Sequence, residues 1–599
     1  MVCFGGGLSY GGSDPTVETE ATAMTAAPET GFRHVSPRAG EPFLHNATRY
    51  LCAATYLNPG YADDVIAELL EDEQRAVAPS YGYDVAPVLL HGLRARRLAL
   101  ARDAALTLIL IVGLWQLTAP TTLVLMVGLC IAVPLWARRY RGVARWKITA
   151  LVGGGVAFLC FGLPLLASLM AAVNEILPSG TPEVGEEYGV PDESALGELL
   201  APAGLLVLVI GAALFVYNRA VADTLINDMA PGVRHDPPAV TSPRVAARVS
   251  AAARAQHGNV VLHAGFNPFP GAGTVFQVWS MVLELRAARS MMDGGPQPRV
   301  DIDPIVLNRH VKQRLAALRG EDLAERERLT GLAVRDQLVA LGTRNHQFPL
   351  IDPQTRVPFS FASRQTMSAV ICHPQGAARH FLRVTTGTQG QPVIGPDGDV
   401  LLPAVDQEIE VSAFVHVAVE GGMLYLEFVS TVLGPIRESL HVIDRLQDRD
   451  PVAWALLETL RRFGTDLVAA PVRLVRGGWG MLSVNRRMDN ASRRSAEPAH
   501  NFGARKSIRE SVSRLAPATY TAWLDAHKYS KLFERRVTDA ILDFLEQSHV
   551  DTGEYRARVN VLHNQGTILQ NSTVTGAVAG GAGAAATTMG APAPVAPGR

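Results

Sequence analysis

The stretch Leu199–Tyr217, LLAPAGLLVLVIGAALFVY, contains no charged residue and is the clearest of four apolar runs. The others cover residues 104–118, 123–136 and 148–172. An α-helix rises about 1.5 Å per residue, so about 20 apolar residues cross the hydrocarbon core of a bilayer. The four runs, within residues 98–218, predict a multi-pass α-helical membrane protein.

Basic residues flank the first two runs on both sides. Cytoplasmic loops carry an excess of Lys and Arg, so both clusters are expected on the cytoplasmic side. Residues 104–136 then form a hairpin, either as two short spans or as a re-entrant pair, and the sequence leaves both open. The acidic segment 174–198 becomes an external loop, and both termini are predicted to be cytoplasmic in a plasma-membrane protein. The two basic clusters are Arg94, Arg96, Arg97 and Arg102, and Arg138, Arg139, Arg141, Arg145 and Lys147.

The remainder of the chain divides by composition and pattern. Low apolar content predicts disorder near the N-terminus, and apolar residues at helical spacing predict a small helical domain before the membrane block. Mixed alternation and helical spacing predict a large α+β cytoplasmic region after it. The expected parts are 1–35 (disordered), 36–97 (helical), 219–470 (α+β), 471–515 (basic linker), 516–558 (helical) and 559–599 (an uncharged β-prone segment with a disordered tail).

Several strands are expected in the α+β region. Alternation from Ile409 to Val419, followed by Gly421-Gly422 and a second apolar run at 423–429, predicts a hairpin in which His416 faces Glu427. Residues 259–266 and 274–286 are predicted as two strands joined across residues 267–273, which end in the Pro270–Gly273 turn. A further strand is predicted at 367–384.

Residues that carry chemistry are scattered. The five cysteines have no CxxC spacing and the histidines no HExxH spacing, so neither a disulfide framework nor a metal is expected. Cys372 is a candidate nucleophile with His380 as its base, whereas His373, its neighbour on a predicted strand, points to the opposite face. His416 and Glu427 are either an acid–base pair or a cross-strand ion pair on the sheet surface, and the second is favoured. The Pro270–Gly273 turn has backbone N–H groups suited to an anion but lacks a P-loop motif, so a structural turn is favoured. No cofactor is expected, and the pattern favours a protein that is not an enzyme.

A basic stretch follows residue 472. In a domain tethered to an anionic leaflet, each Lys or Arg near the surface contributes about 1 kcal/mol of attraction, so this stretch is a candidate lipid contact. A solvated loop is the alternative, and nucleic acid is not expected because no binding motif accompanies the charge. The candidate residues are Arg473, Arg476, Arg486, Arg487, Arg493, Arg494, Arg505 and Lys506.

The segment after Arg558 has no charged residue before Arg599 and combines β-branched with amide side chains. Such segments favour stacked strands, which makes Asn564, Gln565, Gln570 and Asn571 candidate self-association residues.

These patterns support a non-enzymatic membrane-tethered scaffold or sensor. Its partners would be membrane lipids and either another protein or further copies of itself. The alternatives are a self-assembling membrane pore or effector, and a membrane-anchored enzyme of unfamiliar type. The bias toward Ala, Arg and Gly is typical of a bacterial chain.

Overall fold

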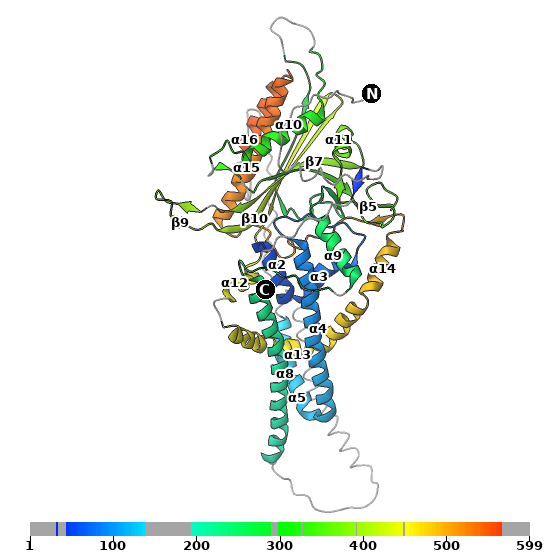
Figure 1. Ribbon diagram of the computed structural model, residues 1–599, viewed down its shortest axis with the longest axis vertical. Helices are drawn as coiled ribbons and strands as arrows, with labels where there is room; N and C mark the ends of the chain where they lie inside the picture. The colour runs from blue at the N-terminus through cyan, green and yellow to red at the C-terminus, as the bar shows by residue number, and fades with distance from the viewer. Residues whose placement is uncertain are drawn as a thin grey trace, which may run out of the picture.

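The computed structural model describes residues 31–33, 44–137, 193–240, 242–288, 297–324, 327–329, 331–390, 392–446 and 450–565. Its described part is elongated, with an α+β head at one end and long helices that form a stalk at the other (Figure 1). The predicted apolar run 148–172, the external loop up to residue 192, and residues 566–599 of the tail lie outside the described residues.

Three long helices build the stalk: α4 (Val85–Gln116), α5 (Thr118–Ala137) and α8 (Glu193–Met229). The helix α4 begins at Asp84, whose carboxylate accepts a hydrogen bond from the Ala86 N–H. The chain reverses between α4 and α5, where Gly113 lies against the side chain of Thr121. The predicted hairpin is therefore present in the backbone, and residues 193–198 of the predicted loop belong to α8.

The prediction of a four-segment multi-pass membrane protein is wrong. Within the described part of the chain, only Val85–Gln116 and Ala201–Met229 are long and apolar enough to cross a membrane. The apolar part of α5, Pro120–Leu129, is too short for that role. Apolar composition alone did not separate a span from a short helix that folds back on its neighbour. The structure supports two candidate spans and a large α+β region with a mixed sheet.

Short helices connect the stalk to the head. The N-terminal helices share one apolar core with the head-proximal end of α8, including Val221 and Leu225, and with Ile436 from the end of the sheet. Because the same core contains residues from all three regions, the head-proximal end of the stalk is fixed to the head. These elements are α2 (Asn46–Leu57), α3 (Pro59–Ile66), the π-helical turn η1 (Ala67–Glu71), α9 (Pro243–Ala255), η5 (Glu438–Leu440) and α12 (Val442–Leu446).

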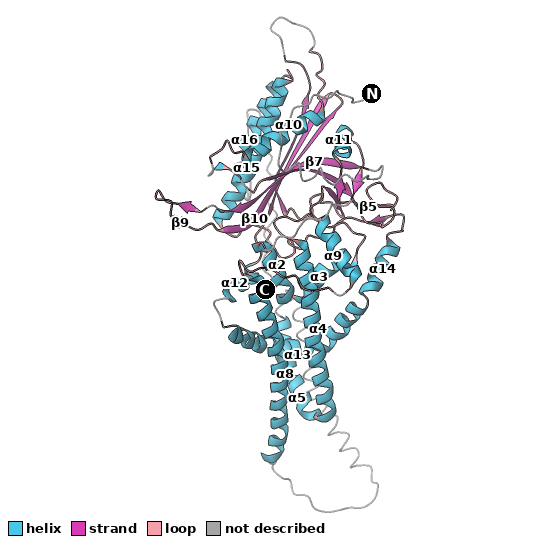
Figure 2. Ribbon diagram, in the orientation of Figure 1, coloured by secondary structure: helices cyan, strands magenta, loops and turns pink. Residues whose placement is uncertain are grey.

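The head is built on a six-stranded sheet of order β2-β4-β7-β10-β11-β3 (Figure 2). The pair β2 and β4 is parallel, and every other neighbouring pair is antiparallel. The strands are β2 (Val260–His263), β3 (Thr274–Glu284), β4 (Ala333–Leu341), β7 (Ala378–Gln389), β10 (Asp406–Glu420) and β11 (Met423–Leu433).

The predicted hairpin at 409–429 is confirmed. The strands β10 and β11 pair with His416 opposite Glu427, and Gly421 and Gly422 have φ angles of 62° and 77°. Two consecutive positive φ angles match a two-residue hairpin turn. The strands predicted at 259–266 and 274–286 also form, as β2 and β3, but they lie at opposite edges of the sheet.

Helices cover one face of this sheet. Phe533 and Val537 of α15 pack on Val411, Val415 and neighbouring strand residues in the largest core cluster. The opposite face is covered in part by Phe269, whose ring stacks on Phe414 at a centroid distance of 3.8 Å. The covering helices are α10 (Pro304–Ala316), followed by the 3-10 turn η3 (Ala317–Arg319), α15 (Tyr520–Gln547) and α16 (Gly553–Gln565).

Two strand predictions fail locally. Residues 364–372 form the helix α11 (Arg364–Cys372), because the Ser363 hydroxyl accepts a hydrogen bond from the Thr366 N–H and starts a helical turn. Residues 559–565 of the predicted β-prone segment continue α16, whose Tyr555 and Val559 pack in the head core. The remaining strands form small pairs: β1 (Phe32–Arg33) with β6 (Phe361–Ala362), β5 (Thr343–Arg344) with β12 (His500–Asn501), and β8 (Val393–Ile394) with β9 (Val400–Leu402).

Candidate functional site at the helix crossing

The helix α13 (Pro451–Leu482) crosses the stalk and contacts α4, α5 and α8. It starts at Asp450, whose carboxylate accepts from the Val452 N–H, with Pro451 in the first helical position. Leu467 and Ala470 are fully buried against α4 and α8 in an apolar cluster. The region predicted as a basic linker is thus largely helical: it holds the end of α13, then α14 (Val484–Arg494) and β12.

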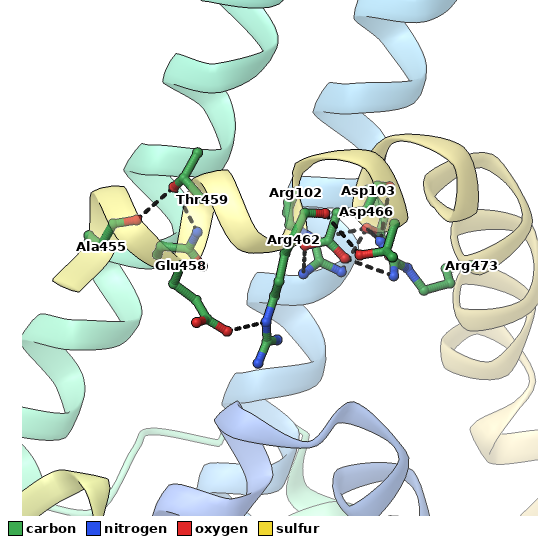
Figure 3. A network of polar contacts seen from close by, with 10 residues as sticks. Arg102, Asp103, Ala455, Glu458, Thr459, Arg462, Asp466 and Arg473 are labelled. Atoms are coloured by element: carbon green, nitrogen blue, oxygen red, sulfur yellow. Dashed lines mark hydrogen bonds and ion pairs between the residues drawn. The ribbon is translucent and has the colours of Figure 1, made fainter. Parts of the chain in front are cut away.

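Four charged side chains meet at this crossing (Figure 3). A guanidinium nitrogen of Arg102 lies 2.8 Å from Asp103 Oδ1 and another lies 3.6 Å from Asp466 Oδ2. A second guanidinium, from Arg473, lies 3.0 Å from Asp466 Oδ1 and 3.2 Å from Asp103 Oδ1. Each carboxylate therefore lies between two guanidinium groups, and the four formal charges sum to zero.

Burial makes this charge cluster sensitive to the loss of any member. The side chains of Arg102, Asp103 and Asp466 are 2%, 4% and 7% exposed. Removing one partner from a buried ion pair leaves an uncompensated charge, which costs about 3–5 kcal/mol. The cluster therefore fixes which residues of α4 and α13 face each other.

The helix α8 adds an aromatic ring and a polar bond beside the cluster. The Arg102 guanidinium lies 4.6 Å from the centre of the Tyr217 ring. The side-chain amide of Asn218 donates to the Thr459 hydroxyl at 2.9 Å, and that hydroxyl donates to the Ala455 carbonyl. All three helices are tied together at one level of the stalk.

This level coincides with a change in the stalk surface. Arg102 and Asp103 directly precede the apolar run of α4, and Tyr217 and Asn218 follow that of α8. On the far side of the crossing, the stalk exposes large apolar side chains. They include Leu108 (63%), Ile111 (59%), Trp115 (83%), Leu205 (61%) and Leu208 (66%).

A second polar network joins the other end of the stalk to the head. Arg49 of α2 donates to the Met229 carbonyl, which ends α8, and pairs with Asp444 at 2.8 Å. The Tyr50 hydroxyl donates to the same carboxylate, and the Tyr50 ring stacks on His441. His441 lies 3.2 Å from Glu408 of β10, and this hydrogen bond raises the pKa of His441. We call these residues the joint network.

The turn at Pro270–Gly273 is structural. Its Gly271 and Gly273 N–H groups both donate to Oε1 of Glu510, at 3.1 and 2.8 Å. Burial raises the pKa of Glu510, and the two backbone donors act in the opposite direction. Gly273 has φ +87° and lies so close to the backbone of Val432 and Leu433 that a Cβ does not fit. The backbone donors that suggested an anion site thus bind a carboxylate of the chain itself.

Residues 278–578, which include α13 and most of the sheet, match the family model of the AbeC-like domain. The chain belongs to the AbeC-like domain family. No curated protein and no solved structure matches it. The AbeC-like region begins within β3, so α4 and α8 precede it, and it contributes Asp466 and Arg473 to the charge cluster.

Within the AbeC-like region, three of the eight predicted lipid-contacting residues lie close to acidic side chains. Arg473 belongs to the charge cluster, and Arg487 pairs with Glu71 at 2.7 Å. Arg505 lies 3.9 Å from Asp72. The other five, which are exposed, are Arg476, Arg486, Arg493, Arg494 and Lys506.

The predicted self-association residues are only partly described. Asn564 and Gln565 end α16, while Gln570 and Asn571 lie outside the described residues.

The two weak catalytic hypotheses gain no support from the AbeC-like region. The His416 Nδ1 is bonded to the His380 backbone carbonyl, and Glu427 accepts from the Tyr425 hydroxyl, although the two residues are opposite in the sheet. His380 is bonded through Nε2 to Asp336, while Cys372 ends α11. Burial opposes ionisation of Asp336, but hydrogen bonds from His380 and Lys312 hold its pKa below the usual value.

Sequence reasoning missed the charge cluster. Its available signal was Asp466 inside an amphipathic pattern, together with Arg102-Asp103 directly before an apolar run. An acidic side chain on the apolar side of a helix requires a buried partner of opposite charge. Arg102, in the basic cluster before the first apolar run, is such a partner.

Proposed function

We propose that the protein is a non-enzymatic, membrane-tethered scaffold. Its stalk enters the bilayer beyond the helix crossing, and its α+β head binds a protein partner or a further copy of the chain. The observation that supports membrane attachment is the distribution of apolar and charged side chains in the stalk. Apolar side chains face outward beyond the crossing and charged ones are buried at it, as expected for helices surrounded by lipid.

Basic residues support an orientation with the head in the cytoplasm. Arg94, Arg96 and Arg97 all lie on the head side of the charge cluster along α4. Positive charge close to a membrane-embedded helix is enriched on the cytoplasmic side. The proposed location is the plasma membrane, with the head at its inner surface.

The tether is tested by vesicle flotation of the full-length protein after a carbonate wash. The protein should float with the vesicles. The double variant Leu205→Asp and Leu208→Asp should float less, because each Asp costs about 2.5–3.5 kcal/mol near the centre of a spanning helix. The matched control Val405→Asp and Leu515→Asp, at exposed head positions, should float like the unchanged protein. Unchanged protein that remains in the aqueous fraction would overturn the tether.

The scaffold is tested by affinity purification from native membranes in mild detergent, followed by mass spectrometry and native sizing. A stoichiometric foreign protein supports partner binding, and assemblies of this chain alone support self-association. In the second case, deletion of residues 566–599 should reduce assembly size if the tail mediates contact. A monomer without partners in both measurements would contradict the scaffold.

A further inference from the structure

The helix α13 exposes apolar residues at both of its ends, on either side of the middle part that packs against the stalk. Seven of its large apolar residues are more than half exposed, and they occur in both halves of the helix. They are Leu456 (52%), Leu457 (63%), Leu460 (68%), Val472 (70%), Val475 (74%), Trp479 (68%) and Leu482 (83%). We call these seven residues the outer face of α13.

The outer face lies within one arc of the helix. At about 100° of rotation per residue, its seven residues fall within about 160° of the circumference. The buried residues Gly464 and Leu467 fall in the same arc, so the exposed apolar residues occupy the two ends of the helix and its middle packs against the stalk. Ala455, Thr459 and Asp466 fall in another sector, and Glu458 and Arg462 lie between the two.

The polar side is turned toward the head. In Figure 3 the side chains of Glu458 and Arg462 extend from α13 in the direction of the N-terminal helices, which are dark blue. The apolar residues Leu467 and Val468 face Gly128 of α5. The apolar side of α13 is therefore turned toward the stalk and away from the head.

We propose that α13 is an interfacial helix whose outer face lies at the boundary between the lipid headgroups and the acyl chains. This inference rests on the proposed tether and specifies where the bilayer surface meets the stalk. The outer face lies at the level of the charge cluster, where the apolar surfaces of α4 and α8 begin. A bilayer that surrounds the far part of the stalk has its surface at this level.

The composition of α13 fits a position at the membrane interface. Trp is enriched at membrane interfaces, and an amphipathic helix with Arg beside its apolar side binds in the interface plane. Arg461, whose side chain is 79% exposed, and Arg476 are placed to reach anionic headgroups by extending past the apolar residues. Arg486 of α14, which is also exposed, adds to this positive charge.

Site-specific photo-crosslinking in vesicles tests the proposal on the full-length protein. A photoreactive amino acid replaces Val475 in one variant, Leu208 in a second and Val393 of the head in a third. The vesicles contain equal parts of phosphatidylcholine and phosphatidylglycerol. Lipid adducts are expected at Val475 and Leu208 but not at Val393, which is 47% exposed in the small β8–β9 pair of the head.

The three positions separate the possible failures. Lipid adducts at Leu208 with none at Val475 would overturn the interfacial helix and leave the tether standing. A crosslink from Val475 to a second copy or to a foreign protein would also overturn it. Lipid adducts at neither position would overturn the tether itself.

Charge provides an independent measurement. The variant Arg476→Gln should lower the yield of lipid adducts at Val475 by up to about fivefold in these vesicles and have little effect in phosphatidylcholine alone. The matched variant Arg494→Gln removes an exposed arginine from the far end of α14 and should leave the yield unchanged. Equal losses in both variants would contradict the specific role of α13.

Discussion

In the head, most of the largest fully buried side chains are aromatic, such as Phe414, Phe428 and Phe533, and they lie between the sheet and its covering segments. In the far part of the stalk the outward residues are apolar, such as Leu208, and the charged Arg102 is buried at its boundary. Water favours the first arrangement because burial removes apolar area from solvent. Lipid favours the second because apolar side chains need no burial there and charges need partners. The comparison supports the proposed tether, in which the head meets water and the far part of the stalk meets lipid.

Among the variants considered, removal of a buried charge in the stalk should reduce the free energy of unfolding most. The variant Asp466→Ala leaves Arg102 and Arg473 with only Asp103 between them, and we expect a loss of about 3–5 kcal/mol in the free energy of unfolding. The matched control is Asp489→Ala, whose partner is Arg244 at 2.8 Å and whose side chain is 55% exposed. It should cost at most about 1 kcal/mol. Denaturant unfolding of both variants in the same detergent compares them, and equal losses would contradict the stalk's dependence on buried charge.

The half-buried carboxylate of Glu510 in the head should matter less, because its hydrogen-bond partners are neutral backbone groups. The variant Glu510→Ala leaves the Gly271 and Gly273 N–H groups without their acceptor, with an expected loss of about 1–3 kcal/mol. Glu510→Gln retains an acceptor oxygen and should lose less. Thermal unfolding measures both, and faster amide hydrogen exchange at Gly271 and Gly273 should accompany the alanine variant. A larger loss for glutamine than for alanine would contradict the role of the carboxylate as acceptor.

A substitution in the joint network should give the smallest loss of stability of the three, and this loss should depend on pH. The hydrogen bond that His441 donates to Glu408 raises the pKa of His441, so its stabilising contribution is complete below the unfolded-state pKa of about 6.5. The contribution is lost as pH rises through the higher folded-state value. His441→Gln should therefore cost up to about 1 kcal/mol at acidic pH and almost nothing at about pH 9. A penalty that grows with pH would have the wrong sign for this interaction.

Local patterns predicted local structure well. Alternation from Ile409 to Val419 and two glycines determined a hairpin with His416 opposite Glu427, because strand period and turn geometry act over few residues. Apolar runs also located α4 and α8. The same reasoning failed in part for the strand predicted at 367–384: its first residues belong to α11, which the hydroxyl of Ser363 starts, whereas residues 378–384 lie in β7.

The sequence by itself determined which segments are apolar enough to leave water and which strands pair through a short turn. Tertiary structure alone decided that β2 and β3 occupy opposite edges, that Glu510 fills the glycine turn, and that Asp466 joins Arg102 across two helices. The physical reason is separation along the chain. Arg102 and Asp466 are far apart in sequence, and neither periodicity nor turn chemistry carries information over that distance. The charge cluster exists because packing places α13 across α4 and because buried charges are stable only with partners.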